Sequence, residues 1–443
     1  MWGLTAGSLL SFSSPAAAMP EPLRGPNIVI ITVDTLRFDR LSSNGYSRPT
    51  SPNIDALLKR GVRFTESRVP EPLTAPSMAS MMTSLFPHEH GATRNGLRMR
   101  PKLASLGTIL GLRGYQTAAF VGNWTLKDQI SGLGEHFARY NEIFSRKRWF
   151  GIWFREATAE DLTEETLAWI AEHLASSRRP FLVWVHYVEP HAPYRYHREF
   201  ASRLGIRSGS TVPASDRYDT EIAFVDRAIG ELVAGFATLA RPIDPVIVFA
   251  SDHGESLGEH DYWGHGRNLF DQTLRVPMGV VWEKKIKPGT VEAPASILDI
   301  APTLLGLAGL DPPAAFRGFD WSEVLAEGAE PPAGRVTLHQ AHKGAVQGRG
   351  GTDARRQGLL SVGRIAGGRK EILRVKNNHH KIFDLTHDAA ERSNLVAVRS
   401  SSSAELASWL QEVREGLAAS DQLPPPSLDE ASIEQLRSLG YID

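Results

Sequence analysis

Three polar side chains follow apolar runs in this 443-residue chain and could together bind a metal ion. Asp34 ends the run NIVIITVD, and Asp252 and His253 come directly after the run VIVFAS. Two carboxylates and one imidazole suit a hard or borderline divalent cation. A lone Asp at a strand end can equally cap the next helix, but a polar cluster after VIVFAS has no such structural need. We therefore predict a divalent-cation site, with Zn, Mn, Ca and Mg as the candidate ions.

The segments that must position these side chains alternate between apolar strands and amphipathic helices. The strands are continuously apolar, which is typical of a sheet covered on both faces. Helical patterns span residues 161–175 and 221–236. This alternation predicts an α/β fold with a mostly parallel central sheet flanked by helices, in which ligands bind at the carboxyl ends of the strands. The expected strands are residues 28–33, 117–121, 181–188, 246–250 and 277–281.

Several segments resemble the sulfatase family of the alkaline phosphatase superfamily, and they occur in the usual order. The stretch from Thr74 to Ser80, TAPSMAS, is similar to the sulfatase active-site segment, which reads Cys or Ser, any residue, Pro, any residue, Arg. Further similar segments are PHAPY at 190–194, FASDHGESLGEH at 249–260, RVPMGVVW at 275–282, LDIAPTLLGLAGL at 298–310 and KIFDLTHDAAERSNL at 381–395. The resemblance implies an alkaline-phosphatase-like sandwich with a small C-terminal α+β subdomain.

Thr74 departs from the family pattern at the nucleophile itself. In sulfatases the Cys or Ser is oxidised to formylglycine, whose hydrate attacks the sulfate. Oxidation of Thr74 would give a ketone, which hydrates poorly. The family Arg is replaced by Met78, and Asn123 in VGNW stands where many sulfatases carry Lys. The site has thus lost two positive charges as well as the formylglycine precursor.

The resemblance assigns the metal to Asp34, Asp252 and His253, with the Thr74 hydroxyl completing the set. Thr74 would then be a metal-activated alkoxide nucleophile. Pro76 suits a first helical turn, so Thr74 is expected at a helix N-terminus, where the dipole favours negative charge. The alternative is that Thr74 is only an N-cap.

Four further residues match places that contact the transferred oxyanion or the leaving group in relatives. They are His191 in PHAPY, His265 in WGHG, Asn95 in ATRNG and Asn123. His191 and His265 are the expected catalytic partners of Thr74, and the two asparagines are the expected substrate-binding residues. The alternative for both histidines is a packed, hydrogen-bonded imidazole.

These residues predict a metal-dependent hydrolase that forms a covalent ester on Thr74, which water then cleaves. Because an alkoxide has no second hydroxyl to expel the product, phosphate esters suit this route better than sulfate esters. The alternatives are a sulfuric ester hydrolase, a phosphotransferase with an alcohol acceptor, or an inactive binder of an oxyanion ligand. One cation is expected, since a second would need ligands such as Glu189, His191 and His265, and their spacing resembles the one-metal branch better.

Composition excludes few classes of protein. The 49 Lys and Arg residues balance 50 Asp and Glu, which gives no reason to expect a nucleic-acid partner. The expected partner is a small-molecule, lipid or glycan ester, with possible peripheral membrane contact. The chain has no cysteine, so disulfides and thiolate metal sites are excluded. The expected domains are a signal-like or disordered extension at residues 1–25, a catalytic domain at 26–333 and a C-terminal subdomain at 334–443.

Two segments bear on location. The apolar stretch at 3–10 and Ala16-Ala17-Ala18 resemble the end of an export signal, although no Lys or Arg precedes them, so export to the periplasm or beyond is the expectation and the cytoplasm stays open. FSRKRWFGIWFR at 144–155 mixes large apolar side chains such as Trp149 and Trp153 with basic ones. It is interpreted either as an aromatic and basic lid, for an amphiphilic substrate or a membrane surface, or as a buried insertion.

Overall fold

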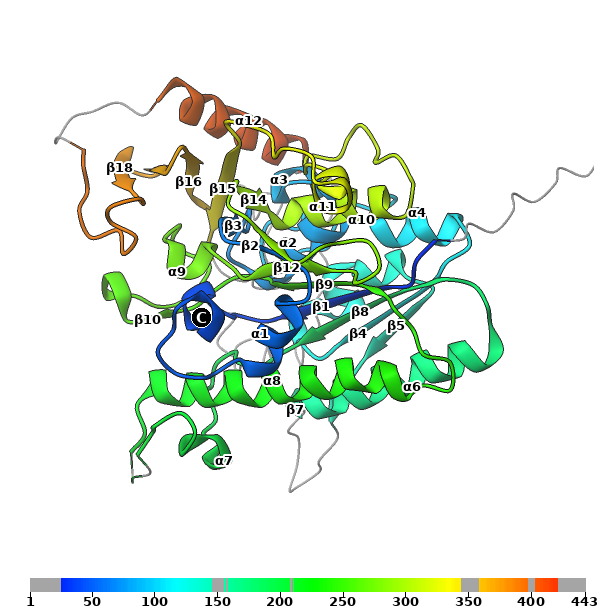
Figure 1. Ribbon diagram of the computed structural model, residues 1–443. Helices are drawn as coiled ribbons and strands as arrows, with labels where there is room; N and C mark the ends of the chain where they lie inside the picture. Colours follow the sequence, from blue (N-terminus) through cyan, green and yellow to red (C-terminus); the bar gives the residue numbers. More distant parts are fainter. Residues whose placement is uncertain are drawn as a thin grey trace, which may run out of the picture.

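The central element of the protein is one large mixed sheet (Figure 1). The computed structural model describes residues 25–145, 155–156, 158–207, 209, 211–343, 358–396 and 403–420. The sheet has eight strands in the order β13-β2-β12-β9-β1-β8-β4-β5. Their bounds are Ile28–Val33 (β1), Val62–Phe64 (β2), Gln116–Val121 (β4), Arg139–Glu142 (β5), Phe181–Tyr187 (β8), Val246–Ser251 (β9), Met278–Val281 (β12) and Gly289–Val291 (β13).

The middle of this sheet is parallel, as the sequence predicts. β1 lies between β8 and β9 and runs parallel to both, and β4 and β5 continue the parallel arrangement beyond β8. β12 runs antiparallel to β9 and to β2, so the strand expected at 277–281 forms but runs in the opposite direction. Alternate side chains of β1 enter different apolar cores, Ile28 and Ile30 on one face and Val29, Ile31 and Val33 on the other. Burial on both faces explains the continuously apolar strand sequence.

Helices cover both faces of the sheet (Figure 1). α1 (Pro52–Leu58), α6 (Ala159–Ser176) and α8 (Ala214–Thr238) pack on one face. α8 buries Ile222, Val225, Ile229 and Leu232 along one stripe, as its helical periodicity predicts. α2 (Thr74–Thr83), α4 (Leu106–Leu112) and α10 (Ile300–Leu307) pack on the opposite face. The two-sided α/β architecture is therefore confirmed.

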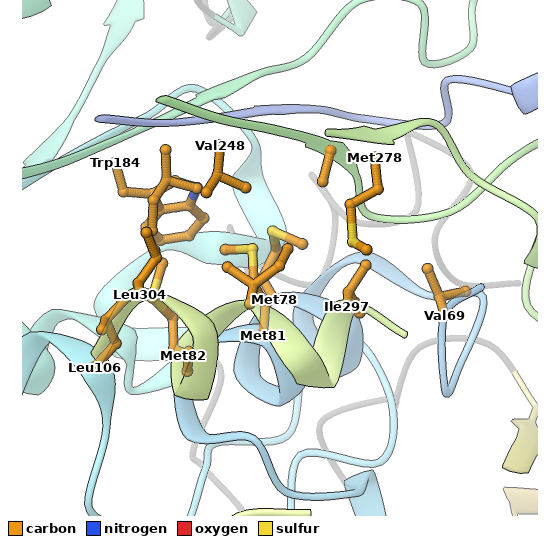
Figure 2. Packing of buried hydrophobic residues seen from close by; sticks show 14 of the residues in the cluster. Val69, Met78, Met81, Met82, Leu106, Trp184, Val248, Met278, Ile297 and Leu304 are labelled. Carbon is orange, nitrogen blue, oxygen red and sulfur yellow. The ribbon is translucent and has the colours of Figure 1, made fainter. Parts of the chain in front are cut away.

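α2 combines a polar start with an apolar body. Met78, Met81 and Met82 project from it into the core, toward Trp184 and Val248 of the central strands (Figure 2). The unbranched thioether side chains fill irregular gaps between helix and sheet. This packing holds α2 firmly, so its first residue has a defined place above the sheet edge.

The C-terminal part of the chain forms a second, antiparallel sheet (Figure 1). It consists of β15 (Val336–His342), β16 (Leu359–Ala366), β17 (Arg369–Arg374) and β18 (His379–Asp384). α12 (Ala404–Ser420) packs on it, and the indole of Trp409 donates to the backbone oxygen of His339 at 2.9 Å. The small C-terminal subdomain is confirmed as a β-sheet with one helix. The expected boundary at 333/334 stays a prediction; the sheet begins at Val336.

Buried polar contacts join the two sheets. Glu71, fully buried in the loop before α2, accepts hydrogen bonds from the backbone nitrogen of His342 at 2.8 Å and from its Nδ1 at 2.9 Å. Lys370 of β17 is also fully buried and pairs with Asp271 at 2.8 Å and Glu391 at 2.7 Å. The same Asp271 pairs with Arg68 at 2.7 Å.

The remaining elements are short. Residues 1–24 and 146–154, which include the signal-like stretch and most of the expected lid, lie outside the described residues. Among the helices that the structure describes, none has the length and apolar character needed to cross a membrane. The short elements are β3 (Ser67–Arg68), α3 (Pro87–His90), α5 (Asp128–Ser131), β6 (Phe144–Ser145), β7 (Arg155–Glu156), α7 (Arg198–Ala201), β10 (Ser256–Leu257), β11 (Trp263–Gly264), α9 (Asp271–Leu274), β14 (Ala295–Ser296) and α11 (Ser322–Glu327).

Candidate active site

Two adjacent strands bring the predicted carboxylates together. β1 and β9 are hydrogen-bonded neighbours, and their register pairs Val33 with Ser251. The next residue on each strand is Asp34 and Asp252, so both follow at the same carboxyl edge. Both side chains are fully buried. Carboxylates are buried in this way when a positive charge or hydrogen-bond donors compensate them.

His253 completes a group of three metal-binding side chains. Its Nδ1 lies 2.9 Å from the backbone oxygen of Gly254, to which it donates, so Nε2 carries the lone pair. Nε2 lies 3.4 Å from Oδ2 of Asp252 and 3.8 Å from Oδ1 of Asp34. One ligand atom from each of the three residues lies within 4.8 Å of the others. This arrangement presents two oxygens and one nitrogen to a common point.

Each carboxylate has one oxygen held by donors, while the other faces His253. Oδ1 of Asp252 accepts hydrogen bonds from the backbone nitrogens of Thr35 at 3.0 Å and of His253 at 2.7 Å. Its Oδ2 is buried and has no hydrogen-bond partner in the described part of the chain. Oδ2 of Asp34 accepts a short hydrogen bond from Nδ2 of Asn123. A buried, unsatisfied carboxylate oxygen beside an imidazole lone pair fits a divalent cation.

Burial shifts the pKa of two of these groups, in each case toward the uncharged form. It raises the pKa of Asp252, although His186 opposes the shift, and it lowers the pKa of His253 well below the usual value. A neutral imidazole is the form that coordinates a metal. A cation would also supply positive charge beside two buried carboxylates.

Thr74 is the first residue of α2, and its side chain points at the metal-binding group. Leu73 occupies the N-cap position, so Thr74 does not serve as the cap. The Thr74 hydroxyl lies 3.3 Å from Nε2 of His253 and is fully buried. Pro76 falls within the first turn, as the sequence predicts. The hydroxyl is therefore next to both the helix N-terminus and the proposed cation position.

His265 and His191 extend the site beyond His253. The His265 ring centroid lies 4.3 Å from that of His253 and 5.4 Å from that of His191. Nδ1 of His265 pairs with Glu255 at 3.0 Å, and Nδ1 of His191 donates to the backbone oxygen of Ala192 at 2.6 Å. These contacts fix both rings at the side of the metal-binding group.

The two added imidazoles differ in charge preference. Burial alone would lower the pKa of His265, but the Glu255 carboxylate outweighs burial and raises it. Burial lowers the pKa of His191 to about 4, and the neighbouring His265 adds to that shift. At neutral pH His191 is therefore neutral, while His265 takes up a proton more readily. Environments that separate two pKa values in this way are characteristic of acid and base pairs in active sites.

The two predicted substrate-binding asparagines differ in the hydrogen bonds of their side-chain amides. Oδ1 of Asn95 accepts from the backbone nitrogen of Ala75 at 3.0 Å, and its buried Nδ2 has no hydrogen-bond partner among the described residues. That amide nitrogen keeps two donors beside the start of α2. Asn123, by contrast, directs its Nδ2 to Asp34, and its Oδ1 accepts from the nitrogen and hydroxyl of Thr125, both at 2.7 Å.

The structure also brings in residues that sequence reasoning did not assign. Glu255, two residues after His253, is the buried partner of His265. His186 was not singled out, yet its Nε2 lies 3.8 Å from Oδ2 of Asp34. The available signal was a lone imidazole inside the otherwise apolar strand FLVWVHY. Met78, at the position of the family Arg, is fully buried in the apolar core and brings no charge to the site.

A second group with metal-ligand spacing exists among the described residues, formed by His88, Glu89 and Glu412. Its two carboxylates already pair with Arg317, at 2.6 Å and 2.7 Å. Nδ1 of His88 contacts Oε1 of Gln340 at 3.0 Å. With a guanidinium between the glutamates, this group is a structural ion pair where α12 meets α3.

Known proteins of one family resemble this chain in sequence and in fold. Residues 26–310 match the family model described as Sulfatase. The chain is 28% identical over 355 residues to an ulvan-active sulfatase of Formosa agariphila, covering 72% of this chain and 68% of that protein. It is 25% identical over 400 residues to human arylsulfatase A, covering 77% and 75%. A phosphonate monoester hydrolase of Agrobacterium radiobacter has the same fold, with a TM-score of 0.68, 19% identity and coverage of 89% and 95%.

Proposed function

This chain belongs to the sulfatase family, and we propose that it is a metal-dependent hydrolase that cleaves phosphate esters through Thr74. The observation that carries the proposal is the position of the Thr74 hydroxyl, 3.3 Å from Nε2 of His253 at the start of a buried helix. A hydroxyl needs activation to act as a nucleophile at neutral pH. Asp34, Asp252 and His253 provide the place from which that activation would come.

Asp34, Asp252, His253 and Thr74 would hold one divalent cation. When bound there, it would lower the pKa of the Thr74 hydroxyl and attract a nonbridging oxygen of the ester. The N-terminus of α2 adds a partial positive charge beside the same hydroxyl. Thr74 Oγ1 loses its proton to water and attacks phosphorus, the bond from phosphorus to the leaving oxygen breaks, and the alcohol departs with a proton. Water then attacks the phosphothreonine, the phosphate is released, and Oγ1 of Thr74 takes up a proton again.

The surrounding residues have separate tasks in this scheme. His265, charged more readily because of Glu255, lies where it can protonate the departing alcohol, and neutral His191 lies beside it. Asn95 offers the two donors of its Nδ2 to an oxygen of the transferred group. Asn123 acts through Asp34, whose Oδ2 it holds. The substrate-binding role predicted for Asn123 would need this contact to rearrange.

A phosphate ester is preferred because of what the nucleophile lacks. A threonine alkoxide has no second hydroxyl to expel the product, so release depends on water. Phosphothreonine is open to such attack with cation assistance. Sulfuric esters are the second candidate class, because the relatives reported above include proteins named as sulfatases. For the alcohol portion we propose a small molecule or a glycan, since one solved structure of similar fold, at a TM-score of 0.69, is a complex with a neocarrahexaose.

One cation per chain is proposed. Of the groups that could hold a second, His265 pairs with Glu255, and burial followed by the Glu221 charge raises the pKa of Glu189 to about 8. Glu189 is therefore mostly protonated at neutral pH and a poor metal ligand. Elemental analysis should give one tightly bound metal per chain. Two metals, both lost on His191→Ala, would overturn this count.

The test of the nucleophile is a comparison of Thr74→Ala with Thr74→Ser. Both should fold, but only the serine variant keeps a hydroxyl at the helix N-terminus. With a panel of aryl phosphate, phosphodiester, phosphonate and sulfate substrates, the alanine variant should lose at least about a thousandfold in turnover. Mass spectrometry of quenched wild-type reactions should find phosphate on Thr74. Near-wild-type activity of Thr74→Ala would refute the nucleophile, and a clear preference for aryl sulfate would refute the substrate class.

A further inference from the structure

His186 approaches one carboxylate oxygen of Asp34, and His253 approaches the other. His186 belongs to β8, in register with Thr32 of β1, and both side chains are fully buried. Nε2 of His186 lies 3.8 Å from Oδ2 of Asp34, whereas Oδ1 of Asp34 faces His253. Nε2 has no hydrogen-bond partner among the described residues. A buried imidazole next to a metal-binding carboxylate is worth accounting for, because such groups set how the ligand is presented.

The contacts of Thr32 leave two arrangements for the proton of His186. The indole nitrogen of Trp184 lies 2.8 Å from the Thr32 hydroxyl oxygen and can only donate to it. The hydroxyl proton of Thr32 is then donated either to Nδ1 of His186 at 2.8 Å or to the backbone oxygen of Val185 at 3.3 Å. In the first arrangement Nδ1 accepts at the shorter distance, and in the second Nδ1–H donates to the hydroxyl oxygen. The surroundings of Nε2 favour the first.

The contact between Nε2 and Asp34 distinguishes these two tautomers. A neutral imidazole has one proton, and Nε2 of His186 faces Oδ2 of Asp34 at 3.8 Å. If that proton were on Nδ1, a lone pair on Nε2 would face the Asp34 carboxylate in a buried place. Two acceptors facing each other without a donor are costly there. With the proton on Nε2, the same approach becomes an attractive contact.

We propose that Trp184, Thr32 and His186 form a directional hydrogen-bond relay that directs the Nε2–H of His186 toward Asp34, an electrostatic contact at 3.8 Å. The relay is a positioning device for the metal-binding site, and it rests on the proposed function only in taking Asp34 as a metal ligand. Together with the hydrogen bond from Asn123 to Oδ2, this contact favours the orientation in which Oδ1 is presented toward His253. Because both donors are neutral, Asp34 keeps its full negative charge for the cation. A Lys or Arg in the same place would compete with that cation.

The first test measures metal affinity, without any turnover. Metal-free protein is titrated with Mn²⁺ and Zn²⁺ by calorimetry. His186→Leu should weaken binding about 10- to 100-fold, the usual effect of losing a partner of a metal ligand. His186→Gln, which keeps a donor at the same reach, should recover most of the affinity. Thr32→Val should weaken binding less than His186→Leu.

The matched control is His339→Leu, the same substitution at another buried histidine. His339 lies in the C-terminal sheet and bonds the backbone oxygen of Val69 and the hydroxyl of Thr337. It should lower the free energy of unfolding but leave the metal affinity unchanged. Equal affinity of wild type and His186→Leu would overturn the relay. So would equal weakening by His186→Leu and His339→Leu, because the effect would then be a general loss of packing.

The second test reads the tautomer directly. In protein labelled with ¹⁵N-histidine, the His186 signals are identified by their absence in His186→Gln, and their couplings should show the proton on Nε2. A proton on Nδ1 would overturn the proposal whatever the enzyme does. The relay and the proposed function fail separately: an inactive protein with an Nε2 proton and a His186-dependent metal affinity would refute only the esterase. An active, Thr74-dependent enzyme with an Nδ1 proton would refute only the relay.

Discussion

The candidate active site and the junction between the two sheets both bury carboxylates, but they are compensated differently. At the junction, Asp271 pairs with Arg68 and Lys370, and Glu391 pairs with the same lysine at 2.7 Å. At the candidate active site, no Lys or Arg among the described residues forms an ion pair with Asp252, whose neighbours are histidines and backbone amides. The junction balances its carboxylates with side-chain cations, whereas the candidate active site surrounds Asp252 with groups that could share a metal ion with it.

Removing Lys370 should destabilise the junction, because this lysine pairs with two buried carboxylates there. Lys370→Met would leave Asp271 buried with Arg68 as a cation and would remove the cation that pairs with Glu391. Breaking a buried pair from one side typically lowers the free energy of unfolding by about 3–5 kcal/mol. Urea unfolding should show this loss, while turnover per folded molecule stays near wild type. The control is Arg369→Met in the same strand, where the 58% exposed side chain should contribute less than about 1 kcal/mol. Equal effects of the two variants would contradict the comparison.

Replacing Asp252 of the candidate active site should have the opposite effect and stabilise the metal-free protein. In Asp252→Asn, Oδ1 can keep its two backbone donors, and Nδ2 can donate to Nε2 of His253, now 3.4 Å from Oδ2. We expect activity to fall by at least about a hundredfold. Loss of a side chain that binds the metal should reduce activity more than loss of a residue that only positions such a side chain. Metal-free Asp252→Asn should be more stable than metal-free wild type by about 1 kcal/mol.

The cation provides the internal control for that experiment. At a concentration about 100 times its dissociation constant, Mn²⁺ or Zn²⁺ should raise the free energy of unfolding of the wild type by about 2.7 kcal/mol. The same addition should leave Asp252→Asn nearly unchanged, as measured by urea unfolding with and without chelator. Similar stabilisation of both proteins would place the cation elsewhere.

The free energy of unfolding should also depend on pH through a buried histidine at the junction, His339. Burial lowers the pKa of His339 to about 3, far below the usual value of 6.5. The unfolded chain therefore binds this proton as the pH falls below 6.5, while the folded protein does not until about pH 3. Stability is fully present above pH 6.5 and is lost as the pH falls, by about 2 kcal/mol at pH 5 for this one residue. His339→Gln should reduce the difference in unfolding free energy between pH 7.5 and pH 5 by that amount. An unchanged difference would show that His339 does not contribute to the acid response.

The parts of the molecule that follow from local pattern were predictable. Continuously apolar strands and the stripe on α8 indicated a covered parallel sheet, and adjacent strand ends placed Asp34 beside Asp252. The motif around Pro76 placed Thr74 in the first turn of a helix. The direction of β12 was not predictable, because an apolar strand has the same sequence pattern in either direction.

What could not be predicted depends on contacts between distant segments. Asp271 and Lys370 are 99 residues apart and have no local signature. Asn123 was interpreted through a family position, whereas its amide orientation is set by Thr125 and Asp34. His186 was passed over because a single polar residue in a strand shows neither its partner nor its tautomer. These features require the register of β1 against β8, which only the fold supplies.

The burial of Lys370 has a consequence for any attempt to shorten this protein. Residues 26–310 cover the match to the family model, but the cation for Asp271 and the partner of Glu71 come from β17 and β15. A truncation at residue 310 would strip counter-charges from the catalytic half and expose the apolar surface on which Trp409 packs. We therefore expect residues 26–310 alone to fold poorly, because the C-terminal sheet supplies part of the interior that the two portions share.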